Sequence, residues 1–389
     1  MSVWSVLVGQ DELVAGLTRT VTAADHALRG ATSTGMTHAW LFTGPPGSGR
    51  STAARAFAAA LLCDRAGCGD CLSCRTALAG THADVSVIDT EQSVITVGTA
   101  REAVRNAALA PVGGRWQVVI VEDADRLNEP AADALLKSIE EPPPRTVWLL
   151  CAPTVEDVPP TIRSRCRSLL LRTPPTAAVA AHLVATEGVP QALATFAARA
   201  SQGHIGRARA LALDESTRNR RREVLRIPGR LSDLGSCMTS AANLVDVATE
   251  EAEPRSSRLD AKETADLEMV YGVGSRGVRA SGYAAAQKEL QKGHRQRSKR
   301  LVRDQIDRAL LDLASFYRDV VAVQIGSRTE LINEELRPDI ATMARDTTGE
   351  TTAQRLSAIF ATREALEGEV SPVLALESLM ISLRGGLHD

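Results

Sequence analysis

The sequence predicts an α/β domain built on a parallel sheet, followed by a region that is almost entirely helical. Two observations lead to this fold class. In the first half, short apolar runs alternate with helical spacing, which is typical of a parallel sheet buried on both faces. From Thr176 onward the helical spacing continues almost without a break. With 389 residues, of which 44% are hydrophobic, the chain is long enough for two or three domains with sizeable cores.

The elements of the α/β domain are expected in a regular order. Four apolar runs are predicted as strands, because each is short and is bounded by loop or helical patterns. The strands are expected at 39–43, 85–89, 118–121 and 147–151, and the helices at 13–28, at 51–62, through Val104 and through Ile139. The pair Pro174-Pro175 interrupts the pattern and marks a domain boundary, so we place this domain at residues 1–173.

We expect the helical remainder to form a small lid at 174–230 and a larger domain at 231–389. Segment 250–282 is charged at first and then rich in glycine, which we interpret as a mobile loop. A predicted basic helix follows, and a solvated face is favoured for it over a contact with DNA or an acidic partner. Its basic residues are Lys288, Lys292, Arg295, Arg297, Lys299, Arg300, Arg303 and Arg308.

Charge and composition exclude several classes of protein. A net charge of -2 excludes a wholesale cationic nucleic-acid binder, so any DNA contact must come from a local patch or a surface shared with partners. Aromatic residues make up 3% of the chain, which argues against base stacking as the main means of recognition. The N-terminal residues lack a basic region followed by an apolar run, and no apolar run has the length of a membrane span. We therefore expect a cytoplasmic protein with no membrane partner.

A phosphate-loop pattern lies between the first predicted strand and the next helix. Glycines in such a loop allow close backbone approach, the amides surround phosphates, a basic side chain reaches the outer phosphates, and a hydroxyl coordinates magnesium. The strand before and the helix after give the motif its required context, so we expect binding of ATP or ADP with Mg²⁺. The residues expected to contact nucleotide here are Gly44, Pro45, Pro46, Gly47, Ser48, Gly49, Arg50, Ser51 and Thr52.

Two departures from this pattern make efficient hydrolysis doubtful. The basic position is Arg50, whose planar and longer side chain is no conservative replacement for a lysine between β- and γ-phosphates. The apolar run 118–121 ends in Glu122-Asp123, the reverse of a magnesium-binding Asp followed by a water-activating Glu. These acids are candidates for a degenerate catalytic pair, and the alternative is that they only cap the following helix.

Four cysteines follow the phosphate loop with the spacing C-x4-C-x2-C-x2-C. They are Cys63, Cys68, Cys71 and Cys74, and such steps let neighbouring sulfurs converge on one tetrahedral metal ion. The competing interpretation is a pair of redox C-x2-C sites or disulfides, which rarely persist in a reducing compartment. We therefore expect structural Zn²⁺. For the isolated residues Cys151, Cys166 and Cys237, the favoured interpretation is that of small buried hydrophobic side chains.

These motifs together resemble one family. The order Val8-Gly9-Gln10, the phosphate loop, the four cysteines, Leu135-Leu-Lys-Ser-Ile-Glu-Glu-Pro-Pro143 and Ser164-Arg165-Cys166 is similar to that of the AAA+ clamp-loader subunits of bacterial DNA polymerase III. The resemblance covers roughly residues 1–215, and it extends to the helical remainder only loosely. It implies an AAA+ domain with a zinc module and a helical lid, followed by an all-α collar that holds the chain in a ring of related subunits.

Within the family, the resemblance favours the delta-prime subunits. Motor subunits of the tau/gamma type have an intact lysine phosphate loop and an Asp-Glu pair, whereas delta-prime subunits have degenerate versions, as Arg50 and Glu122-Asp123 are. The residue that would sense the γ-phosphate falls at Ala152 or Pro153, and neither supplies a side-chain hydrogen bond.

The resemblance further implies partners and two arginine roles. The partners are the tau/gamma and delta subunits, the sliding clamp and, through the assembled complex, primer–template DNA. Arg165 would act as an arginine finger on the ATP of a neighbouring motor, and its alternative is a buried arginine that pairs with a carboxylate. Arg207, next to the position of the family's second sensor arginine, is a candidate for nucleotide contact.

Two other functions stay open. The chain could be an ATP-hydrolysing motor of the tau/gamma type that uses Arg50, Ser51, Glu122 and Asp123. It could also be a stand-alone AAA+ remodelling protein, which the joint presence of the cysteine module and Ser164-Arg165-Cys166 disfavours. The first is distinguished by hydrolysis in the isolated chain, and the second by the partners that purify with it.

Overall fold

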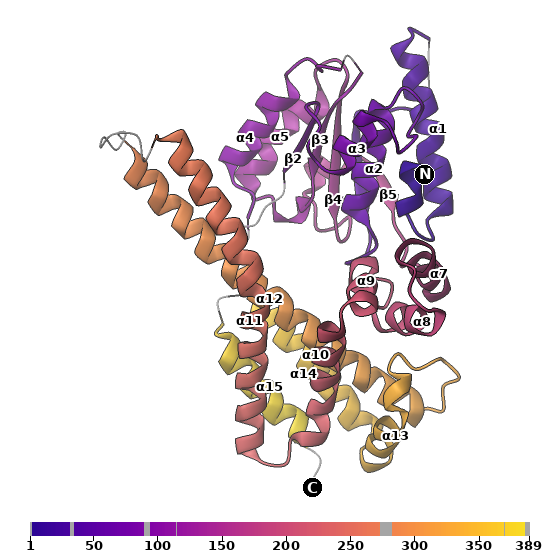
Figure 1. Ribbon diagram of the computed structural model, residues 1–389, viewed down its shortest axis with the longest axis vertical. Coiled ribbons are helices and arrows are strands. Elements are labelled where there is room, and N and C mark those ends of the chain that lie inside the picture. The colour runs from indigo at the N-terminus through magenta and orange to yellow at the C-terminus, as the bar shows by residue number, and fades with distance from the viewer. Residues whose placement is uncertain are drawn as a thin grey trace. The chain divides into compact units, whose positions relative to one another are not determined.

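The computed structural model describes residues 2–31, 35–88, 94–113, 115–272, 282–368 and 370–385. The chain divides into two compact units, Met1–Leu213 and Asp214–Asp389 (Figure 1). Within the described part, none of the helices has the length and apolar character that crossing a bilayer requires.

The first unit contains a five-stranded parallel sheet. Its order is β2 (Val85–Ile88), β3 (Gln117–Val121), β4 (Thr146–Ala152), β1 (Ala39–Thr43) and β5 (Arg167–Leu170). The central strands β1, β3 and β4 are buried along their whole length, as continuous apolar runs require. The four predicted strands are confirmed, although Asp89 lies outside the described residues. The edge strand β5 was not predicted, because it is partly exposed and opens with Arg167-Ser168.

Helices cover both faces of this sheet. On one face lie α1 (Asp11–Leu28) and α2 (Arg50–Leu62), where Phe57 meets Trp40 edge to face with 5.3 Å between ring centroids. On the other lie α4 (Val97–Ala107) and α5 (Glu129–Glu140). The short α3 (Leu72–Leu78) and α6 (Pro160–Arg163) were not predicted, since neither is long enough to show helical spacing.

Three further helices complete the first unit. They are α7 (Thr176–Glu187), α8 (Gln191–Ala200) and α9 (Ile205–Leu213), which share a small core rich in alanine. Val8 from the N-terminal segment packs into this core. Gln10 donates from its side chain to the carbonyl oxygen of Arg172 (2.6 Å) and accepts from the Arg172 amide (3.3 Å). The N-terminal segment therefore fixes the chain that enters these helices.

The second unit is entirely helical in its described part. Its long central helices are α11 (Leu234–Val270) and α12 (Tyr283–Gln324), which pack with α10 (Glu215–Arg226), α13 (Arg337–Asp346), α14 (Gly349–Glu367) and α15 (Pro372–Arg384). The interpretation of 250–282 as a mobile loop is wrong for its first part, because α11 continues to Val270. Ion pairs between its acidic residues and α12 stabilise this helix. Residues 273–281 lie outside the described residues.

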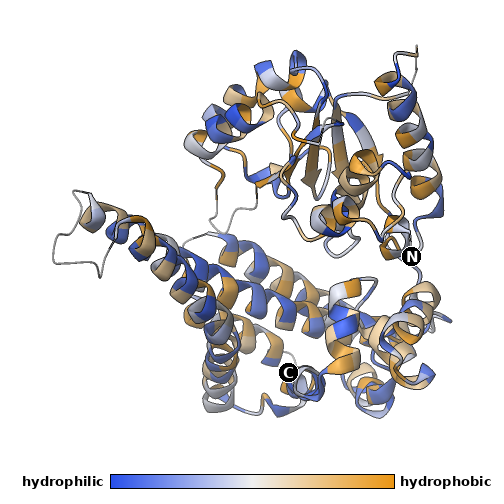
Figure 2. Cartoon of the chain, turned by 45° about the horizontal axis from the view of Figure 1, so that its top comes forward, coloured by the Kyte–Doolittle hydropathy of each residue, from blue (hydrophilic) through white to orange (hydrophobic). Residues whose placement is uncertain are grey.

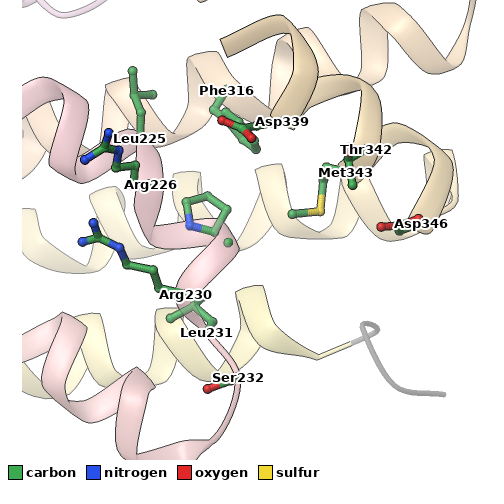
Figure 3. A pocket seen from close by; sticks show the side chains of 12 residues that line it. Leu225, Arg226, Arg230, Leu231, Ser232, Phe316, Asp339, Thr342, Met343 and Asp346 are labelled. Atoms are coloured by element: carbon green, nitrogen blue, oxygen red, sulfur yellow. The ribbon is translucent and has the colours of Figure 1, made fainter.

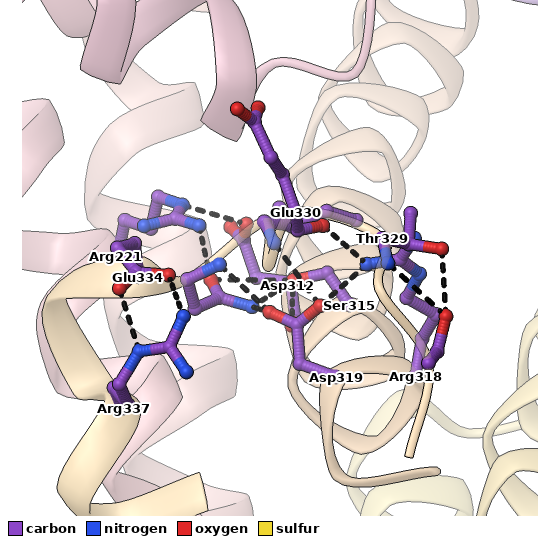
Figure 4. Close-up of polar contacts among 12 residues, drawn as sticks. Arg221, Asp312, Ser315, Arg318, Asp319, Thr329, Glu330, Glu334 and Arg337 are labelled. Carbon is purple, nitrogen blue, oxygen red and sulfur yellow. Dashed lines mark hydrogen bonds and ion pairs between the residues drawn. The ribbon is translucent and has the colours of Figure 1, made fainter. Parts of the chain in front are cut away.

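A buried polar network explains where the two units divide (Figure 4). Arg221 on α10 has a side chain that is 4% exposed, and it pairs with Asp312 on α12 (3.1 Å) and with Glu335 (2.9 Å). Asn333 donates to Asp319 (2.9 Å), which also accepts from the Asn333 amide (2.7 Å). The predicted lid 174–230 therefore crosses the division at 213/214, since its last helix α10 belongs to the second unit.

Candidate functional site

The phosphate-loop residues connect β1 to α2, as the sequence predicted. Thr43 ends the strand, and Arg50 begins the helix after Gly49, which has φ +92°. The Gly44 amide donates to the carbonyl oxygen of Pro153 at the end of β4 (3.0 Å), so the loop lies at the carboxyl edge of the sheet. Amides at the start of α2 and the positive end of its dipole make this an anion-binding position.

Arg50 is folded back onto the loop itself. Its Nη1 donates to the carbonyl oxygen of Gly44 at 2.5 Å, and the side chain is half-buried. A guanidinium in this position supplies positive charge close to the loop. To reach the outer phosphates of a nucleotide, it must give up its bond to Gly44 or share its donors.

The acidic pair follows β3, and its two carboxylates have different partners. Glu122 accepts from Arg55 on α2, at 2.8 Å from Nε and 2.7 Å from Nη2. Asp123 lies 3.9 Å from Arg126. The helix-capping alternative is wrong for α5, because Asn128 caps that helix by accepting from the Ala131 amide (2.9 Å).

Arg55 is a site residue that the sequence reasoning missed. It follows Ser51 by one turn of α2, so it lies on the side of the helix that faces the end of β3. Helical spacing counted from the phosphate loop would have indicated it. Both of its donors contact the same oxygen, Oε1, so Arg55 competes with a hydrated magnesium ion for this carboxylate. Nearby, burial raises the pKa of Asp125.

His204 is a second missed residue, and it closes the outer side of the loop. Gly47 has φ +80°, and a Cβ placed on it would lie 2.5 Å from His204 Cβ and 2.2 Å from His204 Cγ. The start of α9 is therefore seated directly against the loop. His204 Nδ1 accepts from the Arg207 amide (3.2 Å), and the role of Arg207 in nucleotide contact stays a prediction.

The end of β4 offers no polar side chain to a γ-phosphate. Ala152 is the last residue of this strand and is fully buried, and Pro153 follows it. Ala152 and Pro153 therefore lie beside the loop, at the position where a residue that senses the γ-phosphate would be expected. The Pro153 carbonyl oxygen accepts from the Gly44 amide.

The four cysteines converge at the other end of α2. Their sulfurs lie within 4.8 Å of one another, and Cys63 Sγ is 3.7 Å from both Cys68 Sγ and Cys71 Sγ. A regular tetrahedron with Zn–S bonds of 2.3 Å has S···S edges of about 3.8 Å. The cluster therefore has the size and donor set for one metal ion.

Backbone donors prepare this cluster for negative charge. The amides of Cys71 and Asp70 lower the pKa of Cys68 to about 6. Burial opposes ionisation of Cys63, but amides around it outweigh that effect and lower its pKa. Burial raises the pKa of Cys74, which is the least exposed of the four. A bound cation would offset the cost of holding a buried Cys74 thiolate.

Arg165 lies in the turn between α6 and β5, with its side chain 37% exposed. Its Nε and Nη2 both contact Glu140 at the end of α5. Nη1 donates to the Thr161 carbonyl oxygen (2.6 Å) and to Ser164 Oγ (3.1 Å). The alternative was a buried arginine paired with a carboxylate. Arg165 does pair with a carboxylate, but it is not buried. Glu140, within the quoted 135–143 motif, was not singled out from sequence.

Cys151 is the buried thiol expected from sequence, whereas Cys166 is only half-buried. Burial raises the pKa of Cys166 to about 12, and burial also raises the pKa of Cys151 in the middle of the sheet. Neither thiol is ionised near neutral pH.

The second unit has a cluster of titratable side chains and a pocket. Asp260, Glu263 and His294 lie close enough to hold a metal ion, but Arg297 bridges the two carboxylates at 3.1 and 2.6 Å and already neutralises them. A pocket of ≈ 800 Å³ is lined by Phe316, Met343 and Asp339 together with Arg226 and Arg230 (Figure 3). Its residues all belong to the helical unit.

Part of the first unit is similar to known proteins. Residues 22–175 match the family described as DNA polymerase III, delta subunit. DNA polymerase III subunit delta' of Pseudomonas aeruginosa is 43% identical over 136 residues, which cover 33% of this chain and 41% of that protein. DNA polymerase III subunit tau/gamma of Haemophilus influenzae is 31% identical over 209 residues, 51% of this chain and 29% of that protein.

Among solved structures, a gamma subunit-related protein of DNA polymerase III from Thermotoga maritima aligns with a TM-score of 0.44 and 14% identity, over 95% of this chain and 100% of that one. The chain spans less than half the length of the two curated relatives described above. Through residues 22–175, the chain is similar to AAA+ clamp-loader subunits of bacterial DNA polymerase III.

Proposed function

We propose that this protein is a delta-prime-type subunit of a clamp loader, which assists the ATP-driven loading of a sliding clamp on primed DNA. The observation that supports this most is a contrast between the chain's own phosphate loop and Arg165, which would act on a neighbour's ATP. The phosphate loop departs from a motor at Arg50, Glu122 and Ala152, whereas Arg165 remains partly exposed at a domain edge.

Its own ATPase activity is weak or absent under this proposal. Arg50 bonds to the loop, and Arg55 occupies Glu122, so two groups that hydrolysis needs have other partners. ATP or ADP with Mg²⁺ binds through Gly47, Gly49 and Ser51. The amides at the start of α2 supply the attraction for phosphate.

One Zn²⁺ ion per chain is held by Cys63, Cys68, Cys71 and Cys74. The S···S distances and the lowered pKa of Cys68 support a four-thiolate site. The ion would have a structural role, since four protein ligands leave no open position for substrate.

Arg165 is proposed to act in trans on the ATP of a neighbouring subunit of the tau/gamma type. Guanidinium groups at such positions stabilise charge on the transferred phosphoryl group and contribute roughly 10³–10⁵ in rate in well-studied enzymes. The other partners would be a delta subunit, the clamp and primer–template DNA. The helices after residue 230 would form the collar that joins this ring.

The test uses a reconstituted complex in which only this subunit is changed. Arg165→Ala should lower the DNA- and clamp-stimulated ATPase, while zinc content and the melting temperature of the isolated subunit stay unchanged. Arg163→Ala is the matched control, because it removes a guanidinium two residues away, at the end of α6. Equal ATPase in the Arg165→Ala and wild-type complexes would show that Arg165 is structural.

The alternative, a motor ATPase of the tau/gamma type, is favoured by the preserved strand–loop–helix around Gly44 to Ser51. Steady-state hydrolysis by the isolated chain separates the two. A rate of roughly 1 s⁻¹ or more that Asp123→Asn abolishes would establish the motor and exclude the delta-prime assignment.

A further inference from the structure

The outer parts of α11 and α12 form a helical hairpin that projects beyond the other helices of the second unit (Figure 1). It comprises residues 250–270 of α11 and 283–302 of α12, and hydrophilic segments recur along both helices (Figure 2). We call these residues the arm. Its two described helices are antiparallel neighbours, so each has one side toward its partner and one toward solvent.

Ion pairs fix which side of α12 faces α11. Arg297 is buried, and it donates to Asp260 (3.1 Å) and Glu263 (2.6 Å) on α11. His294 Nε2 lies 3.0 Å from Glu263 Oε2. Because both contacts are made by the same side of α12, the opposite side of this helix is turned to solvent.

Four exposed cations line that opposite side. Lys288, Lys292, Arg295 and Lys299 are spaced at i, i+4, i+7 and i+11, so they fall within an arc of about 60° and are centred roughly 170–180° from Arg297. The stripe is about 16 Å long at 1.5 Å per residue. It is a row of charge of one sign on a rigid support.

The other exposed residues of this segment favour the same kind of partner. Between 288 and 299, the remaining exposed side chains are Glu289, Gln291 and Gln296, and none is apolar or aromatic. Glu289 lies 3.7 Å from Lys292 at the margin of the stripe. Glutamine, lysine and arginine are all donors to phosphate oxygens.

We infer that this stripe binds the phosphate backbone of duplex DNA without reading its sequence. Over about 16 Å of axis, a duplex presents roughly ten phosphate charges, which matches a dense row of cations. Single-stranded DNA is a poorer partner, because the stripe has no aromatic side chain on which bases could stack. A protein interface would need an apolar or aromatic anchor at its centre, and the stripe has none.

The stripe also clarifies the earlier interpretation of the basic helix as a solvated face. From sequence, Arg297 is one of eight equivalent cations. In the structure Arg297 is buried and binds α11, and Lys288, Lys292, Arg295 and Lys299 lie together on the far side. The binding needs neither ATP nor another subunit, so it stands apart from the proposed clamp-loader function.

The experiment measures binding of the full chain to a fluorescent 30-base-pair duplex as salt rises from 50 to 300 mM. The wild type should bind with a dissociation constant in roughly the 10⁻⁴–10⁻⁶ M range of non-specific complexes, and its logarithm should vary linearly with that of the salt concentration. The double variant Arg295→Gln/Lys299→Gln should weaken binding roughly 10- to 60-fold at 100 mM salt and reduce the slope by about 1.8.

The matched control is Arg258→Gln/Lys262→Gln. These two exposed residues lie on the arm but on the side of α11 opposite Asp260, and the variant also removes one arginine and one lysine. It should bind duplex as the wild type does. Equal losses in both double variants, no duplex binding by the wild type, or tighter binding to a single strand of the same length would each overturn the inference. So would capture of an acidic protein whose binding the stripe variant abolishes while duplex binding is unchanged.

Discussion

The two ends of helix α2 hold two sites that differ in how much of their chemistry is in place. At its start, the phosphate loop has the expected backbone, yet its basic and acidic side chains bond to protein groups instead. At its end, Cys63 and three further cysteines have the spacing and the distances of a metal site. One helix therefore begins at a phosphate loop whose side chains bond within the protein and ends at a cluster whose four thiols lie at metal-binding distances.

The difference indicates what each site contributes to this molecule. A metal on the cysteine cluster would order residues 63–74, because α3 begins only at Leu72 and the cysteines make up most of what this segment adds to the core. The phosphate loop packs against the start of α9, because Gly47 lies in direct contact with His204. A loop can hold α9 in place whether or not it hydrolyses nucleotide, whereas a four-ligand metal cluster needs all four ligands.

The largest expected effect is that of Cys71→Ser. Structural zinc in small domains contributes apparent binding free energies of roughly 10–16 kcal/mol at pH 7, so loss of one ligand should release the metal and loosen residues 63–74. Metal analysis and hydrogen exchange measure both. Cys237→Ala, which changes a buried thiol of the second unit, should keep its metal. If freshly purified, reduced wild type contained no zinc, the cysteine cluster would not be a metal site.

The second effect is a difference in thiol reactivity after the metal has been chelated. The pKa of Cys68, about 6, makes it largely thiolate at pH 7, while the pKa of Cys166, about 12, keeps that group protonated. Iodoacetamide should therefore modify Cys68 at least about 100-fold faster. Because the lowered pKa leaves Cys68 ionised above pH 6, its rate should fall only below that pH. The rate at Cys166 should still be rising at pH 9.

Peptide mapping across this pH range checks the result, with Cys68→Ala to assign the fast site. A Cys68 midpoint near pH 9 would mean that the amides of Asp70 and Cys71 do not hold the cluster without metal.

The third effect concerns the packing of α9 against the phosphate loop. Gly47→Ala adds a Cβ where His204 already lies and places a non-glycine residue at φ +80°, so stability should fall by about 1–3 kcal/mol. Gly98→Ala in α4 is the control, since the nearest atom to its new Cβ would be Thr96 Oγ1 at an ordinary 3.6 Å. Thermal unfolding of both variants measures the difference. Equal melting temperatures would show that α9 leaves the loop in solution.

The elements of the first unit were predictable from sequence where a continuous apolar run decides the structure. Strands β1, β3 and β4 are buried on both faces, so nearly every side chain in them is apolar. Strand β5 escaped prediction because it is an edge with exposed Arg167 and Ser168. The cysteine cluster was predictable because its four ligands lie close together in the sequence, with a spacing typical of metal sites. The positions 273–281 of the predicted loop lie outside the described residues.

The partners of the site residues were not predictable, because they come from distant parts of the chain. Arg55 and Glu122 are 67 positions apart, and Arg165 and Glu140 are 25 apart. Gly47 and His204 meet only once α9 is folded against the loop. Sequence spacing within one helix gives the direction of a side chain, but the neighbour it meets depends on the assembled sheet and lid.

The smallest expected effect, and the one that probes the comparison most directly, is that of Arg55→Ala. The side chains of Arg55 and Glu122 are 27% and 16% exposed, so loss of their pair should cost about 1 kcal/mol or less in the free energy of unfolding. The change also frees the Glu122 carboxylate, which can then approach a hydrated magnesium ion. Binding of ATP, followed by calorimetry with and without Mg²⁺, should become more dependent on magnesium. Hydrolysis should remain far below 1 s⁻¹, because Arg50 and the Glu122-Asp123 order are unchanged.

Arg115→Ala, which breaks an ion pair with Asp25 of α1 in the same unit, should leave the magnesium dependence as it is. If Arg55→Ala alone restored turnover, a single ion pair would be all that separates this loop from a motor, and the phosphate loop would be an inhibited site rather than an architectural one.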